Sequence, residues 1–335
     1  MNYETLKALP GVRPAVYRIR RWRDWISPGA VILAYHRIAE PACDPHGLTV
    51  SPREFAEQME VLRRYARPMR LHDVVNRLNG RSLPRDAVAV TLDDGYADNL
   101  HAAKPILERF DIPATCFVTT SAIDSPTGFW WDEVARAFLQ PTILPPQLCL
   151  TIGGRDYRWS LDTAPIANAR AHTFQAVREL VRVAAHDEQQ RVLAELRAWS
   201  GVPADSNSDG CTLTLAELQQ LAAGELVEIG AHTLTHPVLS TLAPDAQRAE
   251  IAGSKHQLEQ WLGRPVTSFA YPYGGALAFN ATSVTAARAA GFTSACVLDA
   301  RRARRGADPF RLSRVMVSGT RKWTGDQFAR WLQTR

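Results

Sequence analysis

The sequence predicts an α/β fold, a distorted (β/α) barrel of about seven strands with a mainly helical insertion. Two observations lead to this fold class. Short apolar runs alternate along the chain with segments of helical period, which is typical of parallel strands joined by crossover helices. About seven such runs occur, and 335 residues are enough for one barrel with an inserted segment.

Composition is that of an ordinary soluble globular protein, with 46% hydrophobic and 22% charged residues. The five cysteines are scattered without a CxxC pair, which favours a reducing compartment over a disulfide framework. We find no apolar signal segment near the start and no apolar run of about 18 residues. We therefore expect a cytoplasmic protein, either free in the cytoplasm or at the inner face of the membrane.

The net charge is +5, and much of it comes from two basic clusters, at 18–25 and 301–311. The simplest interpretation is a solvated surface. The alternative is contact with an anionic partner, such as phospholipid head groups or a lipid-linked sugar, and the basic N-terminus would suit peripheral membrane contact. Nucleic acid is not expected, because the arginines are not interleaved with stacking aromatic residues.

The first half of the chain divides into a basic lead-in, residues 1–29, and the start of the barrel, which we predict over 30–320. Ser51, Pro52 and Glu54 form a helix-start signal, with a capping box and a proline in the first turn. Strands are predicted at 30–36, 87–95 and 113–120, and helices at 51–66, 71–78 and 99–111.

A change of composition marks residues 128–205, which we interpret as an insertion rather than an independent domain. It opens with a helix at 129–139. A β-hairpin over 148–161 should turn near Gly153 and Gly154. A long amphipathic helical stretch is expected over 171–199, followed by a polar loop at 201–210.

The second half of the chain returns to the alternating pattern. Strands are predicted at 226–233, 266–274, 293–298 and 312–319. Helices are predicted at 214–224, 244–263 and 281–291, and a C-terminal helix lies within 321–335.

Polar side chains stand at the carboxyl ends of several predicted strands. They are His36, the pair Asp93 and Asp94, His232 with His236, and the tyrosines Tyr271 and Tyr273. In a barrel of this kind the carboxyl ends of the strands share one face, where active sites lie. We therefore expect these side chains to converge.

The segment HTLTHP, residues 232–237, places two histidines four residues apart, close enough to hold one metal ion. One of the two adjacent aspartates would complete a ligand set of two nitrogens and one oxygen, which leaves positions open for water and substrate. The other aspartate could act as a base. Alone, an Asp-Asp pair is more often a turn or helix cap, and an HxxxH pattern is often incidental. Their occurrence at the ends of separate strands favours a site, and Gly95 allows a sharp turn beside it.

These motifs resemble those of the polysaccharide deacetylases, the NodB-like carbohydrate esterases. TLDDG at 91–95, HTLTHP at 232–237 and YPYG at 271–274 carry the resemblance, which covers about 30–122 and 210–320. It implies a distorted barrel of seven or eight strands. It further implies that Asp93 is the general base, that Asp94, His232 and His236 bind the metal, and that the backbone N–H of Tyr273 helps to form an oxyanion hole.

Two positions depart from the family pattern. Ala270 stands where the family usually has an arginine, so another group must orient Asp93, and Arg311 and Arg314 are the candidates. The last family motif usually supplies a histidine as general acid, but the segment 312–319 contains none. His36 is the best substitute, because it ends a strand on the catalytic face and follows a tyrosine as in members acting on exopolysaccharides.

The segment FWWDE, residues 129–133, is the expected sugar contact. Trp130 and Trp131 could form an aromatic platform for a pyranose ring, although at least one of them should belong to the core. Asp132 could bind a substrate hydroxyl or help to order the site. The remaining histidines are interpreted as surface residues; they are His46, His72, His101, His172, His186 and His256.

The sequence thus predicts a metal-dependent N-deacetylase acting on an amino sugar in a polysaccharide, glycolipid or glycoside precursor. One divalent metal ion is expected, with zinc as the first choice. The alternatives are a related amidase or deformylase acting on a non-sugar or N-formyl substrate, and a catalytically inactive glycan-binding protein.

Overall fold

The computed structural model describes residues 29–80, 83–162, 166–204, 211–320 and 323–333. Apart from Gly29, the basic lead-in lies outside these residues, as do parts of the polar loop at 201–210 and of the segment 321–335. No helix among the described residues is long and apolar enough to cross a membrane.

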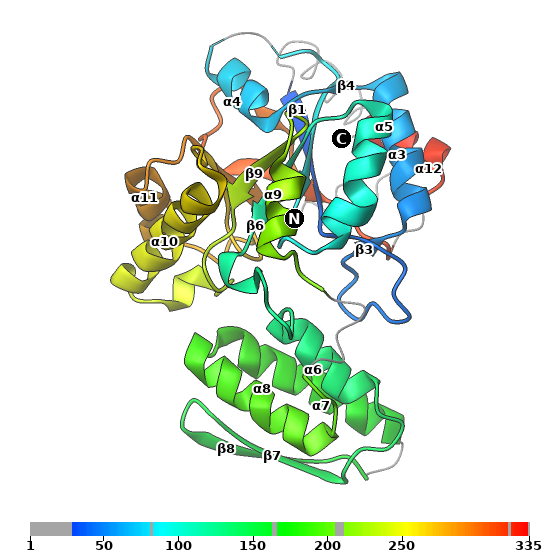
Figure 1. The fold of residues 1–335 in the computed structure, drawn as a ribbon, viewed down its shortest axis with the longest axis vertical. Coiled ribbons are helices and arrows are strands. Elements are labelled where there is room, and N and C mark those ends of the chain that lie inside the picture. Colours follow the sequence, from blue (N-terminus) through cyan, green and yellow to red (C-terminus); the bar gives the residue numbers. More distant parts are fainter. Residues whose placement is uncertain (1–28, 81–82, 163–165, 205–210, 321–322, 334–335) are drawn as a thin grey trace, which may run out of the picture.

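Seven parallel strands close into a barrel, which confirms the predicted fold class (Figure 1). Their order around the barrel is β1-β13-β11-β10-β9-β6-β5, and β5 returns to β1, where Leu33 faces both Val315 and Val90. The bounds of the strands are β1 (Gly29–Tyr35), β5 (Ala87–Leu92), β6 (Ala114–Val118), β9 (Val227–Ala231), β10 (Ser268–Ala270), β11 (Ser294–Leu298) and β13 (Leu312–Met316).

Short strands extend this sheet at two places. β4 (Arg67–Pro68) pairs parallel with β5, and β12 (Ala303–Arg304) pairs antiparallel with β1. A separate pair, β2 (Arg37–Ile38) and β3 (Thr49–Val50), follows the first barrel strand. The barrel strands β1, β5 and β6 are buried at every position, which explains their continuous apolar sequences.

Helices cover the outside of the barrel, with α10 and α11 on one side and α3, α5 and α12 on the other (Figure 1). Ser51 and Glu54 form the predicted capping box at the start of α3. The bounds are α3 (Pro52–Tyr65), α4 (Leu71–Asn79), η1 (Asn99–Ala103), α5 (Lys104–Phe110), η2 (Thr120–Ala122), α9 (Leu215–Ala222), η3 (Leu239–Thr241), α10 (Pro244–Leu262), α11 (Ala281–Ala289) and α12 (Gly325–Gln333).

A further layer lies beside the barrel, at the bottom of Figure 1. It consists of α6 (Trp130–Leu139), the hairpin of β7 (Gln147–Ile152) and β8 (Arg155–Ser160), α7 (Ile166–Val183) and α8 (His186–Ser200). Side chains from α6, α7 and α8, among them Phe138, Val177 and Leu193, share one hydrophobic core. The hairpin turns at Gly153 and Gly154, both with positive φ, as predicted.

The helical stretch predicted over 171–199 is helical, but it forms two helices, a division that the sequence pattern did not indicate. α7 ends at Val183, and Ala185 has extended backbone, with ψ of 151°, before α8 begins. The break lets Val177 and Val181 of α7 and Leu193 and Leu196 of α8 enter the same core, which a straight helix could not do.

Candidate active site

A cavity of about 210 Å³ opens at the carboxyl ends of the barrel strands and is lined from both the barrel and the additional layer. The barrel and its loops contribute the polar residues that the sequence placed at strand ends. The lining residues are His36, His46, Leu48, Asp93, Asp94, Trp130, Trp131, Arg178, Arg182, His232, His236, Tyr271, Tyr273 and Leu298.

The backbone of this site is unusual at four positions. Asp94, Thr233, His236 and Tyr273 all have positive φ, between 58° and 77°, although none of them is glycine. Such conformations are costly and persist only where the surrounding structure enforces them. Next to Asp94, Gly95 has φ of 93°, and a Cβ there would lie 3.2 Å from Val118 Cγ1. The tight turn after β5 therefore aims both aspartates into the cavity.

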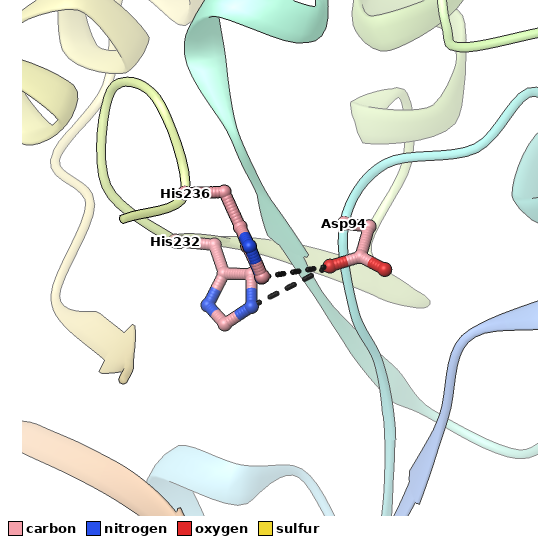
Figure 2. A group of neighbouring side chains, drawn as sticks. All are labelled: Asp94, His232 and His236. Carbon is pink, nitrogen blue, oxygen red and sulfur yellow. Dashed lines mark ion pairs between the residues drawn. The ribbon is translucent and has the colours of Figure 1, made fainter. Parts of the chain in front are cut away.

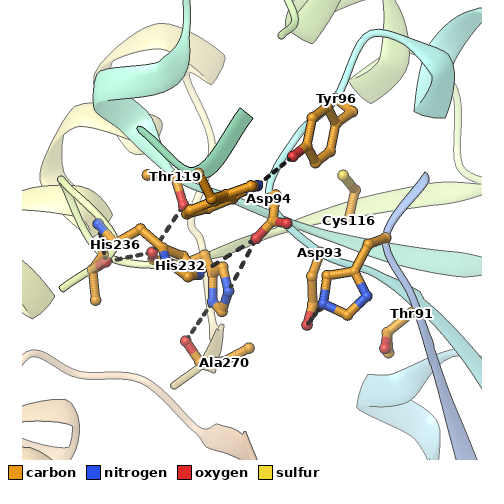
Figure 3. Close-up of polar contacts among 12 residues, drawn as sticks. Thr91, Asp93, Asp94, Tyr96, Cys116, Thr119, His232, His236 and Ala270 are labelled. Atoms are coloured by element: carbon orange, nitrogen blue, oxygen red, sulfur yellow. Dashed lines mark hydrogen bonds and ion pairs between the residues drawn. The ribbon is translucent and has the colours of Figure 1, made fainter. Parts of the chain in front are cut away.

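Asp94, His232 and His236 converge on one point, as Figure 2 shows. The Oδ1 atom of Asp94 lies 3.5 Å from Nε2 of each histidine, and one ligand atom from each residue lies within 4.8 Å of the others. The Nδ1–H group of His232 donates a hydrogen bond of 2.7 Å to the carbonyl oxygen of Ala270 (Figure 3). That bond leaves Nε2 of His232 free to bind a metal.

The electrostatics of these three residues fit a divalent cation. Burial and the neighbouring charge of Asp93 raise the pKa of Asp94 well above its usual value. Burial lowers the pKa of His232 to about 4, and burial with the charge of His232 lowers that of His236 well below the usual range. Neutral imidazoles are the form that binds metal, and a cation would offset the burial of the Asp94 carboxylate. Oδ1 of Asp94 is buried without a hydrogen-bond partner, as a ligand atom would be.

Asp93 is held by Arg314, one of the two candidates named from the sequence. Nη1 and Nη2 of Arg314 donate to Oδ1 and Oδ2 of Asp93 at 2.6 and 2.8 Å, and Nη1 also donates to Thr91 Oγ1 at 3.0 Å. Burial alone would raise the pKa of Asp93, but Arg314, assisted by His232 and His36, lowers it to about 2. The other candidate, Arg311, is exposed and stacks over Phe279 instead.

His36 and Tyr273 both line the cavity, His36 close to Asp93 and Tyr273 close to His236. Nε2 of His36 is 3.9 Å from Oδ2 of Asp93, and burial lowers the pKa of His36. The Tyr273 ring is 4.8 Å from that of His236, and its hydroxyl is buried without a hydrogen-bond partner. Both residues are therefore within the cavity that the metal-binding group faces.

The two tryptophans line the cavity but are nearly perpendicular to each other, at 86°, rather than coplanar. Trp131 Nε1 donates to the Tyr96 hydroxyl, which in turn donates to Asp132 Oδ2, each at 2.8 Å. Asp132 does not line the cavity. Its carboxylate instead fixes Tyr96 and, through it, the Trp131 ring, which packs 4.8 Å from His236.

His46 was wrongly interpreted as a surface residue. It lines the cavity, and its Nε2 is 3.2 Å from the carbonyl oxygen of Trp131. The sequence between β2 and β3 has the pattern of an ordinary loop, so no local pattern indicates that His46 lines the cavity. The other histidines of that group, such as His172 and His186, are exposed as expected.

Glu250 of α10 is a positioning residue that the sequence analysis missed. Its carboxylate accepts hydrogen bonds from the backbone N–H groups of Leu234 and Thr235, both at 2.9 Å, and from Thr235 Oγ1 at 2.7 Å. These bonds hold the turn between His232 and His236. An acidic residue on a helix carries no sequence signal of such a contact.

Arg178 and Arg182 also escaped prediction. Both come from α7 and line the cavity, although helical period alone places them on a solvated face.

A closed barrel with a buried Asp-His-His group at its carboxyl end defines a metal-dependent hydrolase. The family model described as "Polysaccharide deacetylase" matches residues 80–143 and 201–295. The chain belongs to this family, whose members are metal-dependent amide hydrolases.

Comparisons with individual proteins agree with this family. The chain is 30% identical over 106 residues to the poly-beta-1,6-N-acetyl-D-glucosamine N-deacetylase of Escherichia coli K12, which covers 31% of this chain and 16% of that protein. The chain therefore matches only a small part of this curated relative's length.

Two solved structures share the fold over nearly their whole length. The deacetylase PplD of Streptococcus pyogenes, solved in complex with acetate, has 19% identity and a TM-score of 0.59, covering 92% of this chain and 98% of that chain. IcaB from Ammonifex degensii has 22% identity and a TM-score of 0.59, covering 91% and 97%.

Proposed function

We propose that this protein is a metal-dependent N-deacetylase that hydrolyses the N-acetyl group of an amino sugar in a polysaccharide, glycolipid or glycoside precursor. The observation that carries the proposal is the pair of adjacent carboxylates with different partners. Asp94 faces two histidines, whereas Asp93 is held by Arg314. One acid is thus suited to bind a cation and the other to accept a proton.

Asp94, His232 and His236 would hold the cation, and zinc suits a set of two nitrogens and one oxygen. When bound, such an ion supplies Lewis acidity toward the amide carbonyl and lowers the pKa of water. The ligand group is buried, and both imidazoles are neutral at pH 7.

The remaining residues divide the proton transfers between them. With its pKa held at about 2, Asp93 is ionised at neutral pH and takes the proton of the attacking water. The backbone N–H of Tyr273 donates to the oxygen that becomes negative in the tetrahedral intermediate. His36, whose Nε2 lies 3.9 Å from Oδ2 of Asp93, passes the proton that Asp93 has taken from the water on to the leaving nitrogen, which cannot depart as an anion.

The choice of an amino sugar is supported by the aromatic wall and by the relatives. Trp130 and Trp131 line the cavity beside the metal-binding group and can contact a pyranose ring. A relative matched over 106 residues is named for N-deacetylation of poly-beta-1,6-N-acetyl-D-glucosamine.

The cytoplasm, with access to its membrane face, remains our proposed location. Cys43, Cys116, Cys149, Cys211 and Cys296 are all free thiols, which supports a reducing compartment.

The test is release of acetate from a panel of N-acetylated sugars, with formate release from N-formyl analogues and metal content measured on the same samples. Asp93→Asn should retain metal and lose about 10²- to 10⁴-fold in kcat, because the base is removed and the ligand group is not. His232→Ala should lose both metal and activity.

Wild-type turnover by Asp93→Asn would refute the assignment of the base. A purified protein that binds metal but releases neither acetate nor formate would point to an inactive glycan-binding protein instead.

A further inference from the structure

Two guanidinium groups enter the cavity wall from outside the barrel. Arg178 and Arg182 lie four residues apart on α7, so they share one face of that helix. The Cζ atom of Arg182 stands 5.8 Å from the centre of the Tyr273 ring. The family model leaves residues 144–200 unmatched, so these arginines come from a part of the chain that the family pattern does not describe.

The positive charge of this pair is only partly matched. Glu179 accepts from both arginines, with its two carboxylate oxygens 3.2 Å from Arg178 Nη2 and 3.0 Å from Arg182 Nη2. Two guanidinium groups thus share one carboxylate. The side chain of Glu179 is 51% exposed, and ion pairs of that exposure contribute little stability, so a ligand can replace it.

The carboxylates of the cavity itself are committed elsewhere. Asp93 is bonded to Arg314, and Asp94 faces the two histidines. His46 does not add negative charge either. Its Nε2 donates to the carbonyl of Trp131, and its Nδ1 lies 3.5 Å from Arg178 Nη1, where it steadies the guanidinium.

We propose that Arg178 and Arg182 form a subsite for an anionic group of the substrate, a phosphate ester or a carboxylate attached to the N-acylated sugar. Arg182 lies over the ring of Tyr273, and Arg178 lies beside His46, whose Nε2 contacts the carbonyl oxygen of Trp131. Guanidinium groups donate paired, charge-assisted hydrogen bonds to oxyanions, which are stronger than bonds between neutral groups. This inference rests on the proposed function for the identity of the neighbouring sugar.

Binding is the primary readout, so that the subsite is tested apart from catalysis. Calorimetry on the zinc-loaded full chain carrying Asp93→Asn would compare N-acetylglucosamine 1-phosphate, N-acetylmuramic acid and the neutral methyl N-acetylglucosaminide. We expect an anionic probe to bind at least about tenfold more tightly than the neutral one. The better of the two anions distinguishes phosphate from carboxylate.

The double change Arg178→Gln with Arg182→Gln should remove most of this preference. Arg158→Gln is the matched control, because Arg158 is an exposed arginine on β8 of the same layer and does not line the cavity. Without any change to the arginines, raising NaCl from about 0.05 M to about 0.5 M should also reduce the preference.

Equal binding of the three probes, or a preference that survives the double change, would overturn the subsite. Preferential binding without acetate release from any sugar by the wild-type protein would keep the subsite and reject the proposed function. Acetate release without any preference for the anionic probes would keep the proposed function and reject the subsite.

Discussion

The fully buried ion pair of Asp93 and Arg314 sets the charge state of the acid that we propose as the general base. A buried carboxylate without a partner would be protonated or destabilising, whereas a bidentate guanidinium keeps it ionised. Because the folded-state pKa of Asp93, about 2, lies below the ordinary 3.8, the pair stabilises the fold above about pH 4. That contribution is lost as the pH falls toward 2.

Replacing Arg314 by methionine should therefore raise the pKa of Asp93, because burial is then unopposed. We expect the acid limb of the pH profile of kcat/KM to move to higher pH and the free energy of unfolding at pH 7 to fall by about 3 kcal/mol or more. The pH profile and urea denaturation measure these effects. Arg311→Met is the control, since Arg311 is exposed and points elsewhere. An unmoved acid limb in Arg314→Met would contradict the assignment.

Substrates with different leaving groups can show whether His36 donates a proton to the leaving group or only positions Asp93. His36→Ala should lower kcat for an N-acetyl sugar by about 10²-fold or more, because the amine must be protonated to leave. Hydrolysis of 4-nitrophenyl acetate should fall much less, since its phenolate leaves without a proton. Equal losses for both substrates would show that His36 acts by holding Asp93, to which it lies close.

Most residues that line the candidate site could be singled out from the sequence. The two aspartates and the two histidines stood out because they follow predicted buried strands directly, whereas the division of roles between Asp93 and Asp94 came from the family resemblance. The choice between Arg311 and Arg314 was left open, since neither strand period nor motif separates them; only the packing of β13 buries Arg314 completely. His46 and Glu250 could not be found, because their contacts join segments far apart in the sequence.

At the scale of elements, the turn between His232 and His236 is shaped by α10 rather than by its own sequence. Thr233 and His236 adopt positive φ, which costs free energy in an isolated peptide. Glu250 compensates by accepting three hydrogen bonds from Leu234 and Thr235.

Glu250→Ala should therefore weaken metal binding by about 10- to 100-fold while leaving the ligands themselves in place, as for other residues that orient ligand groups. Competition with a chromogenic chelator measures the affinity. Gln260→Ala, an exposed change on the same helix, should have no effect. Unchanged affinity in Glu250→Ala would mean that the turn holds its shape without α10.

The break between α7 and α8 is set mainly by packing and has only a weak local signal in the sequence. The residues around Ala184 and Ala185 are good helix formers, so helical period continues through them. Hydrophobic packing against α6 decides the break. Asp187 and Glu188, which lie in the first turn of α8, are the local sign of a helix start at this point. The same packing turns Arg178 and Arg182 toward the cavity.

At the scale of the whole molecule, the seven strands were predictable because each is a short apolar run. Their order and closure were not, since the pairing of β1 with both β5 and β13 depends on residues at opposite ends of the chain.

The metal should stabilise the whole barrel, because its proposed ligands come from the ends of β5 and β9. A ligand that binds the folded state at 100 times its Kd adds about 2.7 kcal/mol. We expect chelation to lower Tm by several degrees and added zinc to restore it, as measured by calorimetry. His232→Ala is the control and should show no response to either treatment. If neither the chelator nor zinc changes the Tm of the wild-type protein, that result would argue against a bound cation.

Arg314 lies 221 residues after its partner Asp93, on the strand that closes the barrel. During synthesis, Asp93 and the three ligand residues leave the ribosome long before this arginine does. A nascent chain that has not yet reached Leu312 can therefore assemble neither the closed barrel nor a balanced charge at its acid pair. On the proposed mechanism, hydrolysis would therefore begin only once the last strand is in place.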